Sequence, residues 1–280
     1  MNGDGYTVGV TDARPIENAR LLLCGTPFVS ADVSKRVRPD RVFPGATSIL
    51  VVCVKYESAA AFANLSSLGV CSDYHSRVKD VLVKLASELP AHQNKILVDS
   101  PTLCERSLAV RAGLGFFGKN GLVVSPQYGT RHNIGLMLTD IPCEDLLLRY
   151  CDSPTPAKLR SCLPGCDLCI RACPNGALAD GKPLDASRCI SYLTQKKELS
   201  AEEEKLLHGQ LYGCDICQNA CPFNEKAELE WVNPASLIEM TDGEFMEKFG
   251  HTAMMWRGAG MLRRNAGLAA FGYTSPGPSG

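Results

Sequence analysis

The feature that most constrains this chain is the crowding of its cysteines. Fourteen cysteines occur in 280 residues, and eight of them lie between positions 162 and 221. Nothing at the N-terminus looks like a secretion signal, and cytosolic thiols stay reduced, so disulfides are not expected. The clustered eight are therefore candidate metal ligands. The scattered six mostly have apolar neighbours, which predicts buried small hydrophobic residues at Cys24, Cys53, Cys71, Cys104, Cys143 and Cys151.

The eight clustered cysteines form two groups with similar spacing. The first is Cys162-x3-Cys166-x2-Cys169-x3-Cys173-Pro174, and the second is Cys189 followed by Cys214-x2-Cys217-x3-Cys221-Pro222. Proteins with two 4Fe–4S clusters use C-x2-C-x2-C-x3-C-P runs in which the fourth cysteine ligates the other cluster. By this rule the first cluster has the ligands Cys162, Cys166, Cys169 and Cys221. The second has the ligands Cys173, Cys189, Cys214 and Cys217.

Two features depart from that pattern. The gap after Cys162 is three residues rather than two, and 24 residues separate Cys189 from Cys214, so a helical excursion must return Cys189 to the site. The alternative is a pair of zinc sites, because CxxC pairs also bind zinc. A zinc site needs only two CxxC pairs and does not require a doubled CxxCxxxCP motif with crossed fourth ligands. The spacing therefore favours two 4Fe–4S clusters.

The first half of the chain is patterned as mixed helix and strand. Ser48–Tyr56 is rich in valine and isoleucine and predicts a strand. Apolar residues at helical spacing after Asp73 predict a helix that this aspartate caps. We expect a short strand at Lys95–Val98, and a helix at Leu103–Ala112 that stops at Gly113.

Two further apolar runs, Gly121–Ser125 and Asn133–Ile141, flank a turn and are predicted to pair as a hairpin. The proline-containing stretch Cys151–Ala157 is the predicted domain boundary. The expected organisation is an α+β domain at 1–150, a cysteine-rich domain ending in a helix at 151–272, and a disordered tail at 273–280.

The charge balance indicates no general attraction to polyanions. Lys and Arg number 29 against 30 Asp and Glu, a net charge of -1, so nucleic acid would have to meet a local basic patch. No apolar run approaches the roughly 18 residues that a membrane span needs, and we expect a cytoplasmic protein with no membrane partner. Two groups of basic residues either meet phosphate or lie solvated at the surface: Lys35, Arg36, Arg38 and Arg41, and Arg257, Arg263 and Arg264.

A glycine-rich run follows the helix predicted before Gly113. Gly113, Gly115 and Gly118 spell G-x-G-x-x-G, but a dinucleotide site requires this pattern after a strand, so that function is rejected. Two interpretations stay open: a tight packing turn, or a bare backbone that a large flat ligand can approach. Asp99, at the end of a predicted strand, either caps the next helix or takes part in chemistry.

Asp73-Tyr74-His75 resembles the start of the D-x-H-x-x-G motif that gives some corrinoids a histidine ligand. Val78 stands where the glycine of that motif should be. His75 is therefore not assigned to a metal.

Taken together, these residues resemble the epoxyqueuosine reductases, cobalamin-dependent enzymes with two 4Fe–4S clusters. The resemblance covers roughly residues 38 to 270 and rests most on Arg111–Asn120 together with the eight cysteines. The chain looks like a short form without the C-terminal helical repeats of longer members. The other matching segments are Arg38-Pro39, Phe43-Pro44-Gly45-Ala46, Asp73-Tyr74-His75, Asp99, Glu105-Arg106, Cys189–Thr194, Tyr212–Asp215 and Leu262–Ala266.

The resemblance implies a fold and a reaction. The fold is a nitroreductase-like corrinoid-binding α+β domain followed by a bacterial ferredoxin-like two-cluster domain. The reaction is the reduction of epoxyqueuosine to queuosine in tRNA, with the epoxide oxygen lost as water. A low-potential donor such as ferredoxin or flavodoxin would supply the electrons, because thiolate-bound clusters can reach the low potentials that cobalamin reduction requires. Candidate corrinoid contacts are Gly113, Gly115, Gly118, Lys119 and Asn120.

Asp99 matches the proton donor proposed for the family, and an epoxide oxygen that leaves as an anion needs such an acid. Two other functions stay open. A corrinoid-dependent reductase of a small molecule would turn over without RNA. A two-cluster electron-transfer protein without corrinoid would show cluster absorbance and no corrinoid uptake.

Overall fold

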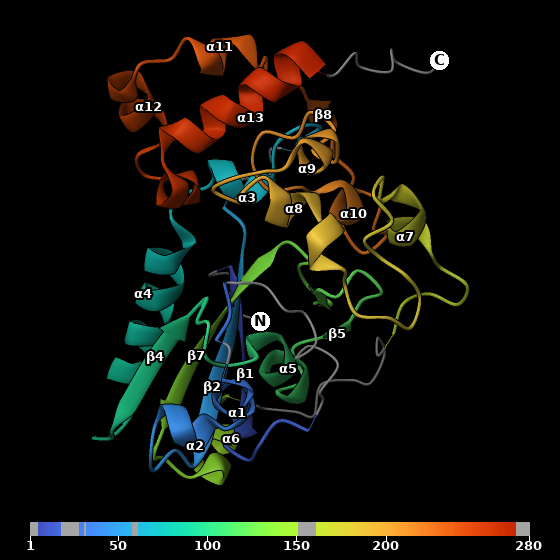
Figure 1. Ribbon diagram of the computed structural model, residues 1–280. Helices are drawn as coiled ribbons and strands as arrows, with labels where there is room; N and C mark the ends of the chain where they lie inside the picture. The colour runs from blue at the N-terminus through green and yellow to red at the C-terminus, as the bar shows by residue number, and fades with distance from the viewer. Residues whose placement is uncertain (1–4, 18–27, 31, 58–60, 151–160, 273–280) are drawn as a thin grey trace.

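A four-stranded antiparallel sheet forms the centre of the N-terminal half. The computed structural model describes residues 5–17, 28–30, 32–57, 61–150 and 161–272. Figure 1 shows the sheet below and the C-terminal helices above it. Each strand pairs antiparallel with its neighbour. The strand order is β1 (Tyr6–Asp12), β2 (Ser48–Lys55), β7 (His132–Thr139) and β4 (Asn94–Val98).

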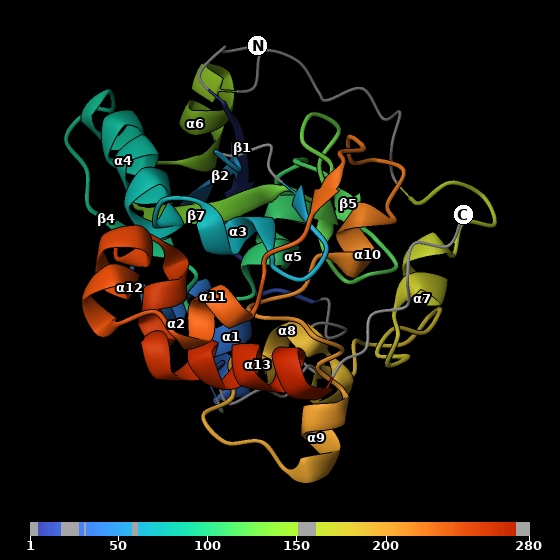
Figure 2. The same ribbon diagram turned by 90° about the horizontal axis from the view of Figure 1, so that it is seen from above.

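Both faces of this sheet are buried, because side chains alternate along β2. On one face, Ile49, Val51 and Cys53 belong to the core that packs against α5 (Glu105–Arg111). Two short helices, α1 (Val33–Val37) and α2 (Pro39–Val42), contribute Val37 and Val42 to the same core. The intervening residues of β2 pack on the other face against α4 (Tyr74–Ser87) and α6 (Cys143–Tyr150). Figure 2 shows these layers from above.

Most of the local predictions in this half are confirmed. β2 and β4 occupy the expected ranges, and α4 begins at Asp73, whose side chain accepts a hydrogen bond from the backbone of His75 at 3.0 Å. α5 ends ahead of Gly113, which has a positive φ of 78°. Cys53, Cys71 and Cys104 are buried, as predicted, Cys143 is partly buried, and Cys24 and Cys151 lie outside the described residues.

The predicted hairpin is wrong. β7 pairs with β2 and β4, whereas β6 (Val123–Val124) pairs with β5 (Phe116–Phe117). The chain turns tightly between Ser125 and Gly129, and the next residue is then drawn towards the cysteine region, where its backbone N–H donates to Asn224 Oδ1 at 2.7 Å. This contact separates the two runs.

The C-terminal body has a core of its own, and part of the N-terminal half contributes to it. β3 (Ala61–Phe62) pairs in parallel with β8 (Leu229–Glu230), and Leu65 is buried beside Leu211. The helices around this core are α3 (Ser67–Val70), α11 (Ala235–Ile238), α12 (Asp242–Phe249), η3 (Ala253–Arg257) and α13 (Ala259–Gly272). The predicted boundary Cys151–Ala157 and the tail 273–280 lie outside the described residues, so the domain limits stay a prediction.

The cysteine region lies between the sheet and the C-terminal helices and consists of loops and very short helices (Figure 1). Its helices are α7 (Leu168–Ala172), η2 (Ala186–Arg188), α8 (Ile190–Leu193), α9 (Ala201–Lys205) and α10 (Ile216–Asn219). Within the described part of the chain, no helix has the length and apolar character needed to cross a membrane.

Candidate redox and proton-transfer site

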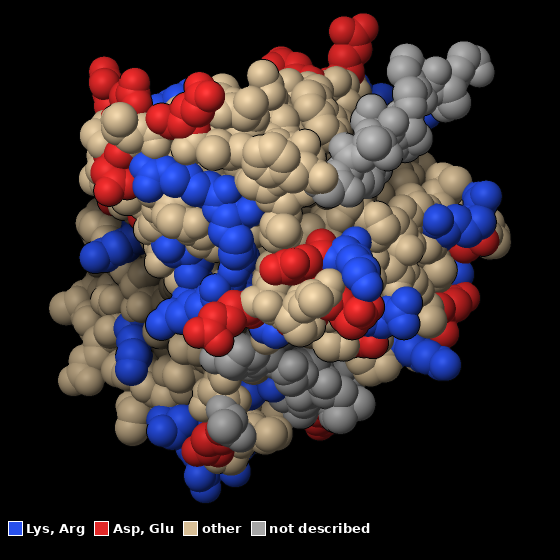
Figure 3. All heavy atoms as spheres, turned by 45° about the horizontal axis from the view of Figure 1, so that its top comes forward, with Lys and Arg blue, Asp and Glu red and all other residues tan. Residues whose placement is uncertain are grey.

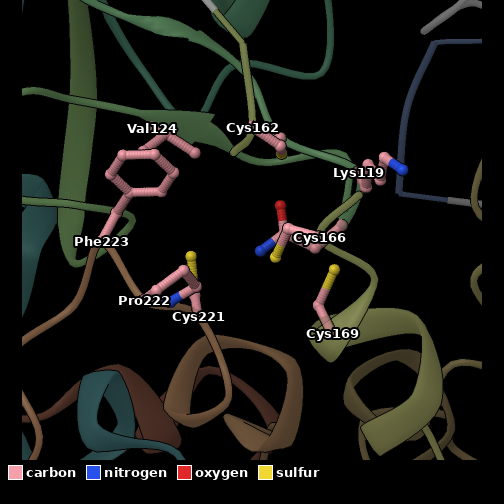
Figure 4. Close-up of a pocket in the computed structure, with 10 residues that line it drawn as sticks. Lys119, Val124, Cys162, Cys166, Cys169, Cys221, Pro222 and Phe223 are labelled. Carbon is pink, nitrogen blue, oxygen red and sulfur yellow. The ribbon is translucent and has the colours of Figure 1, made fainter. Parts of the chain in front are cut away.

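The first predicted ligand set surrounds one cavity. Figure 4 shows Cys162, Cys166, Cys169 and Cys221 around it, brought from the loop before α7, from α7 itself and from the loop after α10. Burial, together with the neighbouring cysteines of the same set, raises the pKa of Cys169 to about 11. Four thiolates in this cavity therefore need a positively charged metal partner.

The second predicted set is also brought together. Burial raises the pKa of Cys214 to about 12, and Cys189 and Cys173 add to that shift. Burial likewise raises the pKa of Cys217 well above its ordinary value, with contributions from Cys214 and Cys189. Cys217 also interacts with Cys169 of the first set. The two spatial groups coincide with the two predicted ligand sets, including the crossing of Cys173 and Cys221.

The arrangement suits a cluster better than single ions. Among the residues that the structure describes, no three His, Cys, Asp or Glu side chains converge closely enough to hold one metal ion. The thiols of the first set instead line the wall of a larger cavity, together with Val124, Pro222 and Phe223. A cubane of four irons and four sulfides needs such spread thiolates, whereas a structural zinc ion needs a tight tetrahedron.

The glycine-rich run lies against this first cavity. Gly118, Lys119 and Asn120 line it, and Lys119 Nζ pairs with Asp180 at 2.8 Å. A Cβ on Gly115 would come within 2.3 Å of the carbonyl oxygen of Val124. Gly115 is therefore explained by close packing against β6, which is the packing interpretation of this run, and corrinoid contact at these five positions stays a prediction.

Asp99 lies at the C-terminal end of β4 with its carboxylate accessible. Its φ is 48°, a left-handed conformation that is uncommon for a residue other than glycine, and its side chain is 66% exposed. The hydroxyl of Tyr74 donates to Asp99 Oδ2 at 2.6 Å. Asp99 does not cap α5, because the N-cap position of that helix is Cys104.

Glu105 supports the loop that carries Asp99. Its Oε1 accepts the backbone N–H of Ser100 at 2.9 Å. Burial raises the pKa of Glu105 to about 8, and the charge of Asp99 contributes in the same direction. A carboxyl in its neutral form thus lies beside the exposed one over much of the neutral range.

Asp99 interacts electrostatically with Tyr212, which precedes the second cysteine set in the chain. Burial raises the pKa of Tyr212 to about 12, with Asp99 adding to the shift and Arg257 opposing it, and Tyr212 precedes Cys214 by two residues. Arg106, next to Glu105, interacts electrostatically with Cys189. The cluster held by the second set would therefore be the one beside the candidate acid.

Two buried polar atoms, in segments that interact with Tyr212, have no hydrogen-bond partner within the described residues. They are Ser67 Oγ and Arg257 Nε. Ser66, the neighbour of the first, donates its backbone N–H to Tyr212 O at 2.8 Å. Buried donors of this kind ordinarily have a partner, so a polar ligand beside Tyr212 fits this part of the molecule.

Several of the basic residues that were expected to meet either phosphate or solvent contact the protein itself. Arg263 pairs with Asp242 at 2.7 Å, and Arg264 donates to the carbonyl oxygens of Lys196 and Lys197 at 2.8 Å. Arg257 lies 3.7 Å above the ring of the exposed Trp256. Figure 3 shows Lys and Arg side chains gathered side by side on the left half of one face, next to a hollow.

The contact of Tyr74 with Asp99 was not expected from the sequence. The two residues are 25 positions apart. The only sequence signal near this contact was that Tyr74 is the first residue of a helix capped by Asp73. Tyr212 and Arg106 were expected through the resemblance, without a role.

Two family models match the chain. One is described as a 4Fe-4S double cluster binding domain and covers residues 162–224, which contain all eight clustered cysteines. The other is described as Epoxyqueuosine reductase QueG, DUF1730, and covers residues 36–100. The predicted pair of 4Fe–4S clusters is thereby confirmed as a property of the region, while the assignment of each ligand stays a prediction.

The chain is also similar to curated and solved proteins over nearly its whole length. It is 32% identical to an epoxyqueuosine reductase of Bacillus cereus, over 94% of this chain and 75% of that protein. An epoxyqueuosine reductase solved with an epoxyqueuosine-modified tRNA-Tyr stem loop is 31% identical with a TM-score of 0.78, over 94% of this chain and 76% of that one. The Bacillus subtilis enzyme, solved with an aspartate catalytic loop swung out of its active site, is 30% identical with a TM-score of 0.78 over the same shares. This chain belongs to the epoxyqueuosine reductase family.

Proposed function

We propose that this protein reduces epoxyqueuosine to queuosine in tRNA, using two 4Fe–4S clusters and cobalamin. The observation that carries the proposal is the exposed carboxylate of Asp99, hydrogen-bonded by Tyr74, in a chain of this family. A proton donor together with clusters that deliver electrons suits a reductive removal of oxygen, which consumes both protons and electrons. The solved relative with a modified tRNA stem loop supports the choice of substrate.

The proposed electron path runs from the first set to the second. Cys162, Cys166, Cys169 and Cys221 would hold the outer cluster, and Cys173, Cys189, Cys214 and Cys217 the inner one. The interaction between Cys169 and Cys217 supports a short step between the two. A low-potential donor such as ferredoxin or flavodoxin would deliver electrons at the outer cluster.

The proposed corrinoid site borders Asp99 on a nitroreductase-like N-terminal domain. Bound cobalamin would supply a strongly reducing cobalt centre. The unpartnered Ser67 Oγ and Arg257 Nε support a polar ligand there. Asp99 would donate its proton to the epoxide oxygen, and Tyr74 would orient the carboxyl through its hydrogen bond.

The test is turnover of an epoxyqueuosine-containing anticodon stem loop by anaerobically reconstituted protein, followed by mass spectrometry of the nucleosides. We expect loss of one oxygen atom from the modified base only when both cobalamin and a low-potential reductant are supplied. Absence of queuosine from a preparation that holds both clusters and cobalamin would contradict the proposed substrate.

A further inference from the structure

The proposed reaction needs more protons than Asp99 holds. Conversion of an epoxide to an alkene and water takes up two electrons and two protons, and both protons end on the departing oxygen. One carboxyl group supplies one of them. A second proton must therefore reach Asp99, or the same oxygen, before water can leave.

The Asp73-Tyr74-His75 segment lies where such a proton could come from. His75 Nδ1 is 2.7 Å from Asp73 Oδ1, and His75 Nε2 is 4.0 Å from Asp99 Oδ2. Asp73 thus fixes the imidazole so that its other nitrogen faces the candidate acid. In this orientation a protonated His75 donates from Nδ1 to Asp73 and carries its second proton on Nε2, towards Asp99.

The hydroxyl of Tyr74, which also contacts Asp99, does not fill this role. Tyr74 already donates to Asp99 Oδ2, and burial, with Asp99 adding to it, raises the pKa of Tyr74, so this hydroxyl keeps its proton. Its donated hydrogen bond favours the ionised carboxylate. Once Asp99 has given up its proton, Tyr74 therefore orients the carboxylate but does not reprotonate it.

The fold itself does not require a histidine at position 75. The side chain is 48% exposed and stacks on the ring of Tyr74 at 4.2 Å. Asp73 would cap α4 with any residue following Tyr74, because the cap uses the backbone N–H of that residue. The imidazole is thus available for chemistry next to Asp99.

We propose that the Asp73–His75 pair supplies the second proton of the reaction through Asp99. Asp99 transfers its proton to the epoxide oxygen as the first carbon–oxygen bond breaks. The resulting carboxylate takes the Nε2 proton of imidazolium His75 after an approach of about 1 Å, which brings the 4.0 Å separation to hydrogen-bond distance. Asp99 then gives this proton to the departing hydroxyl, the second bond breaks, and water leaves.

This inference rests on the proposed function. There, a low-potential donor supplies the two electrons through the clusters and the corrinoid. Neutral His75 recovers its proton from solvent. His75 acts through Asp99, so it is a positioning and proton-supplying residue.

The test compares His75→Gln with His92→Gln in reconstituted enzyme acting on the epoxyqueuosine stem loop. His92 lies before β4, at the opposite end of that strand from Asp99. We expect His75→Gln to lower kcat about a hundredfold, with KM within about twofold of wild type and the iron content unchanged. Added imidazole should restore much of the lost rate to His75→Gln alone, because the site is open to solvent.

Asp73→Asn provides a second, milder variant. Asparagine caps helices as well as aspartate does, so the start of α4 is retained while the charge behind His75 is lost. We expect a smaller drop in kcat and no rescue by imidazole. A His75→Gln enzyme that matches His92→Gln in kcat, or that loses activity without any imidazole rescue, would overturn the relay. A wild-type enzyme without turnover would instead sink the proposed function.

Discussion

The sheet and the cysteine region are held together in different ways. In the sheet, β2 alone buries six consecutive apolar side chains, Ile49 to Val54, into cores on both faces. The cysteine region has helices of only three to five residues between Leu168 and Asn219. Buried polar contacts connect it to the rest of the chain, such as those of Asp215, which accepts from Ser66 Oγ and Ser67 N at 2.8 Å.

The two regions differ in their proposed chemistry as well as in the source of their stability. Apolar burial gives the sheet a rigid end at which Asp99, Tyr74 and His75 can handle protons. The cysteine region would handle electrons, and its short helices gain their stability from the metal that its thiols bind. Variants should therefore separate electron supply from proton supply.

The largest effect is expected when a thiol of the inner set is removed. Cys214→Ala should abolish turnover and lower the iron content from about eight to about four per chain, because one cluster loses a ligand. Cys53→Ala is the matched control, since this buried thiol lies in β2 and should leave the iron content unchanged. Iron analysis and the stem-loop assay measure both. A Cys214→Ala protein with full iron would remove this cysteine from the ligand set.

The next largest effect is expected when proton supply is removed while electron supply is retained. Asp99→Asn retains an acceptor for the Tyr74 hydroxyl but has no acidic proton, so kcat should fall by about 10²–10⁴-fold. Iron content and cluster spectra should match those of wild type. Full turnover by Asp99→Asn with both clusters and cobalamin bound would end the role of Asp99 as the acid.

A moderate loss of stability is expected at the polar junction between the two regions. Asp215→Ala leaves the buried donors of Ser66 and Ser67 without their acceptor, which should cost about 3 kcal/mol and lower Tm by roughly 5–10 °C. Asp185→Ala, an exposed aspartate that caps η2, should cost only about 1 kcal/mol. Differential scanning calorimetry under anaerobic conditions compares them. Equal losses would show that this junction contributes no more than a surface cap.

The remaining effect concerns pH. Burial raises the pKa of Glu105 from 4.5 to about 8, so between these values the folded protein binds this proton more tightly than the unfolded chain. Stability from this group is therefore greatest at low pH and falls as pH rises towards 8. Glu105→Gln keeps an acceptor for Ser100 and removes the titration, so its Tm should change less between about pH 5 and pH 8.

Glu247→Gln, an exposed glutamate on α12, is the control for that experiment. Thermal unfolding at the two pH values measures the difference. If Glu105→Gln and Glu247→Gln show the same pH dependence as wild type, Glu105 is ionised in the folded protein.

Local sequence patterns predicted the elements of this fold better than their partners. The valines of β2 and the spacing of α4 each depend on neighbours within a few residues, so their ranges followed from the sequence. The pairing of β7 with β2 joins residues 77 to 91 positions apart, and the hairpin predicted from adjacency was wrong.

The same contrast holds for the site. The cysteine spacing predicted two ligand sets because the rule for crossed clusters is encoded over short distances. The position of Lys119 against the first cavity, and of Tyr74 against Asp99, depends on packing between distant segments. Periodicity and motif spacing carry no information about such contacts.

The most direct test of this account is metal analysis after anaerobic reconstitution with iron, sulfide and cobalamin. We expect about eight irons and about one cobalt per chain, with Cys221→Ala and Cys217→Ala each losing about half of the iron and Asp99→Asn losing none. Stoichiometric zinc in place of iron, or full iron retention in both cysteine variants, would contradict the two-cluster centre on which the proposed reaction depends.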